Sequence, residues 1–209
     1  MSEEKFIHRY QPGTGPGPTL LLLHGTGGNE NDLLPVGKMI APGTSILSPR
    51  GNVLERGMSR YFRRLAEGVF DLEDLQFRTH ELADWVGEAA ARYDFDAADV
   101  WAVGLSNGAN IAAAIALLRP GVLRGAVLFH PMVPLEPEPA PNLTGFPVFI
   151  GAGQIDPMSP PQETKRLADL LKGYGADVSI HWTPGGHALT NAEVQAAKDW
   201  LAARFRAAK

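Results

Sequence analysis

The chain has 209 residues, of which 44% are apolar and 20% are charged, a composition typical of one soluble globular domain. The net charge of −4 argues against nucleic acid as a partner, and no apolar run approaches the roughly 20 residues that a membrane-spanning helix requires. The chain contains no cysteine, which excludes disulfides, thiolate metal sites and a cysteine nucleophile.

Apolar, β-branched runs alternate along the chain with longer helical patterns, as in a mostly parallel sheet whose strands are joined by crossover helices. The expected strands span residues 6–10, 19–24, 45–48, 99–104, 125–130, 147–151 and 178–182. The expected helices span residues 72–93, 107–118, 162–174 and 191–207. We therefore predict a single α/β domain over residues 1–209, with a mostly parallel central sheet flanked by helices. The first 20 residues lack the apolar core of a signal peptide, so we expect a cytoplasmic protein.

Two irregular stretches lie between the expected elements. Residues 49–70 contain Met58 and Phe62, which either wall a substrate pocket or pack against the edge of the domain. Met132 belongs to a Pro-rich segment, residues 131–141, which is too short for a separate cap domain but long enough to cross a strand end. Within the first stretch, residues 56–64 hold a cluster of four arginines that could attract an anionic group, although a solvated face is the more common role of such a cluster. They are Arg56, Arg60, Arg63 and Arg64.

The pentapeptide Gly104-Leu105-Ser106-Asn107-Gly108 follows an apolar run and precedes an alanine-rich stretch. Gly-x-Ser-x-Gly between a strand and a helix is the pattern of a nucleophile elbow, a sharp turn that lifts the serine hydroxyl clear of the sheet. The glycines let neighbouring backbone pass, and the first N–H groups of the helix can stabilise negative charge beside the serine. A tight turn with an uninvolved serine is the alternative interpretation.

A serine nucleophile needs a base that accepts its proton. Of the six histidines, His187 suits this role best, because it lies in a glycine-containing loop between the last expected strand and the last expected helix. Ligands of open α/β sheets bind at such carboxyl ends of strands. His130, at the end of another expected strand, is the second choice, and an ordinary loop histidine is the alternative for His187.

The base in turn needs a carboxylate that holds it in the right tautomer. Asp156 fits, because it follows the expected strand of residues 147–151 and lies between the serine and the histidine in chain order. The rivals are Asp169, on an expected helix, and Asp177, at the start of an expected strand. A solvated aspartate in a turn is the alternative for Asp156.

An oxyanion hole needs two N–H donors. The amide of Asn107, directly after the serine, is the first. The second is expected from the loop after the strand of residues 19–24, which holds three glycines, and we assign it to the amide of Thr26. His24 is expected to brace this loop. A phosphate-binding loop is the competing interpretation, but the glycine spacing matches neither the P-loop nor the dinucleotide fingerprint.

With these segments the chain resembles the α/β-hydrolase superfamily and, within it, the phospholipase/carboxylesterase family that includes acyl-protein thioesterases. The resemblance covers nearly the whole chain and is most specific at residues 23–30, 104–110, 156 and 186–187. Asn107, Gly108 and Ala109 stand where acyl-protein thioesterases usually carry glutamine and two glycines. This version looks more like the bacterial carboxylesterase branch related to hydroquinone-responsive esterases. Dienelactone hydrolases share the fold but typically use cysteine.

The resemblance implies ester hydrolysis through an acyl-enzyme, without a metal or organic cofactor. Ser106 would be the nucleophile, Asp156 the orienting acid and His187 the base. We expect a serine carboxylesterase that acts on small to medium alkyl or aryl esters. Thioester or lysophospholipid hydrolysis, which needs a long apolar groove, is the alternative, and a non-catalytic binding protein on the same fold is a second one. The expected partner is a small-molecule ester, and the sequence leaves a homodimer open.

Overall fold

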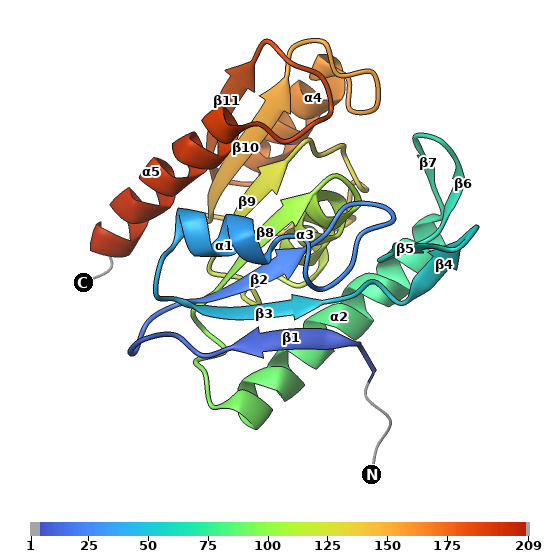
Figure 1. The fold of residues 1–209 in the computed structure, drawn as a ribbon. Coiled ribbons are helices and arrows are strands. Elements are labelled where there is room, and N and C mark those ends of the chain that lie inside the picture. The colour runs from blue at the N-terminus through green and yellow to red at the C-terminus, as the bar shows by residue number, and fades with distance from the viewer. Residues whose placement is uncertain (1–4, 208–209) are drawn as a thin grey trace.

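The computed structural model describes residues 5–207, and its central sheet has seven strands in the order β1-β3-β2-β8-β9-β10-β11 (Figure 1). Every neighbouring pair is parallel except β1 and β3. All seven expected strands are present, with ends shifted by at most two residues. They are β1 (His8–Gln11), β2 (Thr19–Leu23), β3 (Ser45–Pro49), β8 (Val100–Leu105), β9 (Gly125–Phe129), β10 (Pro147–Gly153) and β11 (Asp177–Thr183).

Helices cover both faces of the sheet, which explains why the central strands are apolar throughout. In β2, Leu21 and Leu23 pack into the core on the face of α2, α3 and α4. Leu20 and Leu22 point the other way, into the core beneath α1 and α5. The period of two residues along a strand thus places one run of leucines in two cores.

The helices are α1 (Leu34–Ile40), α2 (Leu72–Tyr93), α3 (Asn107–Leu118), α4 (Pro161–Gly173) and α5 (Asn191–Ala207). The expected bounds of α2, α3 and α5 are confirmed to the residue, and α4 begins and ends one residue earlier than expected. Helix α1 was not predicted, because seven residues that include a proline and a glycine show no clear helical periodicity. Its Gly37 allows close packing on β2, since a Cβ there would lie 2.8 Å from Leu22 Cδ1. No helix of residues 5–207 is long and apolar enough to cross a membrane.

The stretch of residues 49–70, expected to be irregular, forms two small hairpins: β4 (Val53–Glu55) with β5 (Met58–Arg60), and β6 (Arg64–Ala66) with β7 (Val69–Phe70). Arg56 and Gly57 both have positive φ, 51° and 83°, as the first two-residue turn requires. Asn-Gly is the usual signal for such a turn, so Arg-Gly gave no hairpin prediction. The β6–β7 hairpin projects from the body of the molecule beyond the carboxyl ends of the strands (Figure 1).

The order of the strands creates a crevice at their carboxyl ends. From β2 the chain passes to β3 on one side and later returns to β8 on the other side of β2. The loops after β2 and β8 therefore diverge, and open α/β sheets bind their ligands at such a switch point. Ser106 and the loop around Thr26 both lie here.

Candidate active site

Ser106 occupies the turn between β8 and α3 in a strained conformation, with φ 53° and ψ −113°. A non-glycine residue at positive φ costs on the order of 1–3 kcal/mol and persists only where the surroundings enforce it. Here the Ser106 N–H donates to Phe129 O at 2.9 Å, which ties the turn to the end of β9. The strain directs the hydroxyl out of the sheet, as expected for a nucleophile elbow.

The two motif glycines allow the elbow to pack against β2. A Cβ on Gly108 would lie 2.0 Å from Leu23 O, and one on Gly104 would lie 2.5 Å from Gly108 O. No side chain fits at either distance. The spacing of Gly-x-Ser-x-Gly therefore follows from the close contact among β2, β8 and the first turn of α3.

The three residues expected to form the catalytic triad meet in one chain of hydrogen bonds. His187 Nε2 lies 2.8 Å from Ser106 Oγ, and His187 Nδ1 lies 2.8 Å from Asp156 Oδ2. They come from the loops after β8, β10 and β11, whose carboxyl ends meet at the same edge of the sheet. The rivals Asp169 and Asp177 are both exposed, and Asp177 forms an ion pair with Arg204.

Asp156 is fixed as an ionised acceptor. Its Oδ1 accepts hydrogen bonds from the N–H groups of Met158 at 2.8 Å and Ser159 at 3.0 Å. Burial raises the pKa of the Asp156 carboxyl, but hydrogen bonds from the two N–H groups and from His187 outweigh it and hold this pKa below its ordinary value. A carboxylate in this position requires a proton on His187 Nδ1 and leaves Nε2 free to accept one from Ser106.

The two amides assigned to an oxyanion hole lie at the same cavity as Ser106. Asn107 is the first residue of α3, so its N–H has no acceptor within the helix. The Thr26 N–H donates to no group among residues 5–207. His24 braces the Thr26 loop, because its Nδ1 lies 2.7 Å from Gly25 O and its Nε2 accepts from the Gly51 N–H at 2.9 Å.

Asparagines around the elbow fasten the two irregular stretches to it. Asn107 Oδ1 accepts from the Tyr61 N–H, and Asn110 Oδ1 accepts from the Met132 N–H, each at 2.8 Å. Both stretches consequently form walls of the cavity at Ser106. The departure from the Gln-Gly-Gly pattern thus has a structural use that sequence reasoning missed.

The cavity is small, about 40 Å³, and its lining corrects part of the predicted pocket. Met132 lines it as expected. Phe62 does not, because it is fully buried in the core with its ring edge-on to Phe70, and Phe70 lines the cavity instead. Met58 lies outside the cavity on β5, where it covers Gly27.

The arginine cluster is only in part the solvated face that its composition favours, because Arg56 and Arg63 are exposed but Arg60 is buried. Arg60 is 3% exposed and lines the cavity, with Nη1 donating to Thr26 Oγ1 at 2.6 Å and Nε 3.3 Å from Glu55. Arg64 also lines it and donates to both oxygens of Glu55, at 2.9 and 3.1 Å. Of the remaining two, Arg63 has a 61% exposed side chain and pairs with Asp71. The hairpins that bury Arg60 could not be read from the sequence.

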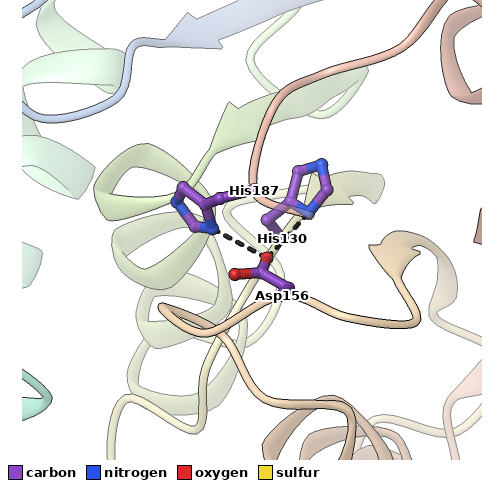
Figure 2. Close-up of side chains that lie close together, drawn as sticks. All are labelled: His130, Asp156 and His187. Atoms are coloured by element: carbon purple, nitrogen blue, oxygen red, sulfur yellow. Dashed lines mark hydrogen bonds and ion pairs between the residues drawn. The ribbon is translucent and has the colours of Figure 1, made fainter. Parts of the chain in front are cut away.

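His130 and Glu193 complete the site below its surface. His130 is fully buried, and its Nδ1 lies 3.1 Å from Asp156 Oδ2, the oxygen that also binds His187 (Figure 2). Its Nε2 lies 3.2 Å from Glu193 Oε1. Both ring nitrogens of His130, the second choice for the base, thus lie next to carboxylates, whereas His187 contacts Ser106. Thr190-x-x-Glu193 predicts a helix cap, but nothing in the sequence predicts the contact of Glu193 with His130.

Donor atoms of His130, Asp156 and His187 lie within 4.8 Å of one another, a spacing that a metal ion could use. Hydrogen bonds explain this spacing, since the Asp156 carboxylate lies at hydrogen-bond distance from both rings (Figure 2). A metal ion would have to displace both of these bonds. The cluster therefore does not fit a metal site.

A model of the dienelactone hydrolase family matches residues 9–207. The chain belongs to this family. The chain is 50% identical to the putative hydrolase MhqD of Bacillus subtilis (strain 168) over 193 residues, which are 92% of this chain and 96% of MhqD. Two solved carboxylesterases are also similar. That of Bacillus cereus has a TM-score of 0.95 at 50% identity, with 98% of this chain and 97% of that chain covered. That of Mesorhizobium loti has a TM-score of 0.84 at 33% identity, with 88% of each chain covered.

These similarities confirm the expected α/β-hydrolase fold and the relation to bacterial carboxylesterases, and they make the chain a hydrolase. The nucleophile typical of dienelactone hydrolases is a cysteine. This member has Ser106 at the elbow and no cysteine in its sequence.

Proposed function

We propose that the protein is a serine carboxylesterase that hydrolyses small esters through an acyl-enzyme. The observation that supports this most strongly is the continuous hydrogen-bonded chain from Ser106 through His187 to Asp156 at the mouth of a cavity. Two N–H donors beside the serine complete the set of groups that acyl transfer needs.

In the acylation step, Ser106 Oγ attacks the ester carbonyl carbon while His187 Nε2 takes the hydroxyl proton. The carbonyl oxygen becomes an oxyanion, which the N–H groups of Thr26 and Asn107 stabilise together with the positive end of the α3 dipole. As the C–O bond to the alcohol breaks, His187 returns the proton to the leaving oxygen. The products of this step are the free alcohol and an ester of Ser106.

In the deacylation step, a water molecule gives a proton to His187 and its oxygen attacks the acyl carbon. A second oxyanion forms at the same two N–H groups. It then expels Ser106 Oγ, which recovers its proton from His187. Asp156 stays ionised throughout and stabilises the imidazolium that forms twice in each turnover. The protons that move in this cycle come from Ser106 and from water, and His187 carries each of them.

The cavity at Ser106 favours small acyl groups. Its volume of about 40 Å³ corresponds to roughly three or four water-sized spheres. Part of its wall consists of Arg60, Arg64 and Glu67, so it is not the long apolar groove that thioester or lysophospholipid substrates need. A non-catalytic binding role is also less suited, because all members of the triad are in hydrogen-bonding contact.

The direct test is Ser106→Ala, assayed with p-nitrophenyl acetate. We expect the variant to fold with an unchanged circular dichroism spectrum and to lose nearly all turnover. Ser179→Ala is the matched control, since Ser179 lies on β11 and binds Trp200 rather than the site. Full turnover in a folded Ser106→Ala protein would refute the proposal.

A further inference from the structure

Two buried carboxylates face the two ring nitrogens of His130, a residue with no role in the proposed cycle. Asp156 lies 3.1 Å from Nδ1 and Glu193 lies 3.2 Å from Nε2, and all three side chains are 0% exposed. The main chain holds His130 in place, because its N–H donates to Gly151 O and its carbonyl accepts from Ser159 Oγ. The ring is therefore fixed between two acceptors away from water.

Both carboxylates are ionised. The pKa of Asp156 lies below its ordinary value, as described above. Burial also raises the pKa of Glu193, but the nearby His130 ring and the hydrogen bonds from Thr190 outweigh it and hold this pKa below its ordinary value as well. An ionised carboxylate can only accept, so each nitrogen of His130 that faces one must carry a proton.

Only one of the two carboxylate oxygens of Glu193 takes part in the helix cap. Its Oε2 accepts from the N–H and the Oγ1 of Thr190, at 2.9 and 2.7 Å, which closes a capping box at the start of α5. Its Oε1 has only His130 Nε2 as a neighbouring donor among the described residues, in an ion pair not aligned as a hydrogen bond. A glutamine would cap the helix equally well. The charge of Glu193 is therefore explained by His130 and not by the cap.

We propose that His130 is a cationic positioning residue, with Glu193 as its counter-ion, that limits how strongly Asp156 holds a proton on His187. The proposal deepens the esterase function proposed above and rests on it. The centre of the His130 ring lies 5.2 Å from the centre of the His187 ring, and both histidines contact the same oxygen of Asp156 (Figure 2). The positive charge thus disfavours a second proton on His187 and keeps it competent as a base at lower pH.

Other charged groups also face His187, and none of them changes in the test below. Asp156 contacts it directly, and Arg60, Arg64 and Glu67 line the same cavity from the two hairpins. Their combined charge is a constant background. A shift caused by a change at His130 therefore reports the charge at that position.

The first experiment is the pH profile of kcat/KM for His130→Gln, in which an amide keeps one donor for Asp156 but removes the charge. Two unit charges 5.2 Å apart, at an effective dielectric constant of about 20–40, change a titration by about one to two pH units. We expect the acidic limb of the profile to move to higher pH by that amount. His181→Gln, on β11 outside the site, is the control and should leave the limb in place. An unmoved limb in folded His130→Gln would overturn the proposal.

The second experiment needs neither turnover nor a folded His130 variant. In ¹⁵N NMR of histidine-labelled wild-type protein at pH 7, both ring nitrogens of His130 should show protonated shifts. In Glu193→Gln, which retains the helix cap, the ring should lose a proton as the pH rises across the neutral range. A neutral His130 ring in the wild type at pH 7 would overturn the proposal. This readout stays decisive even if Ser106→Ala retains activity, so failure of the esterase function and failure of the His130 proposal are distinguishable.

Discussion

Asp156→Asn should nearly abolish turnover while leaving the fold intact, and the structure explains why. Oδ1 of Asp156 accepts from two main-chain N–H groups, of Met158 and Ser159. The carbonyl oxygen of an asparagine must take this position, which leaves its NH₂ group facing His187 at the position of Oδ2. His187 Nδ1 then has to accept a hydrogen bond, so the ring proton moves to Nε2, which can no longer take a proton from Ser106.

The expected cost follows from this wrong tautomer. Loss of the orienting carboxylate in a triad lowers kcat by about 10,000-fold, equivalent to about 5 kcal/mol of transition-state stabilisation. The residual rate comes from the oxyanion donors and from binding, which the substitution leaves in place. Initial rates with p-nitrophenyl acetate at saturating concentration measure it.

Asp169→Asn is the matched control, because Asp169 is exposed on α4 and is one of the two rival acids in the sequence. It should retain the wild-type rate. A loss of less than tenfold in folded Asp156→Asn would refute the tautomer argument.

Three further predictions concern the cavity, the elbow and the brace of the Thr26 loop. With p-nitrophenyl esters of increasing acyl length, kcat/KM should fall beyond short chains, and a steep rise towards long chains would favour the thioesterase or lysophospholipase alternative. Gly108→Ala should destabilise the protein by about 3 kcal/mol or more in urea unfolding, because its Cβ would lie 2.0 Å from Leu23 O. By contrast, Gly87→Ala on the open face of α2 should stabilise it by about 0.5–1 kcal/mol. Burial lowers the pKa of His24 in the folded state, so its contribution to stability is complete above the ordinary value of 6.5 and is lost as the pH falls below it. Melting temperatures of His24→Gln should therefore vary less with pH below 6.5 than those of the wild type, and an equal dependence would contradict this cause.

The sheet and the longer helices could be predicted because burial on both faces leaves a direct trace in the sequence. The leucines of β2 and the alanine-rich α3 read as buried elements before any tertiary contact is known. The meeting of Ser106, Asp156 and His187 could be predicted for a related reason. Each of the three follows a recognisable strand, and parallel strands bring their carboxyl ends to one edge.

The parts that could not be predicted depend on contacts between distant segments. Phe62 and Phe70 are both aromatic residues of the same stretch, and only the fold of the hairpins decides that Phe70 reaches the cavity. The burial of Arg60 has the same origin. The sequence around Glu193 predicts a helix cap, which explains the contact of one carboxylate oxygen with Thr190. It does not predict the contact of the other oxygen with His130.

The most direct test of the central claim is to identify the residue that carries the acyl group. Acid quenching during turnover of p-nitrophenyl acetate, followed by peptide mass spectrometry, should find one acetyl group on the peptide that contains Ser106 and none in Ser106→Ala. Acetylation of a different residue with Ser106 unmodified, at the wild-type rate of ester hydrolysis, would contradict the account.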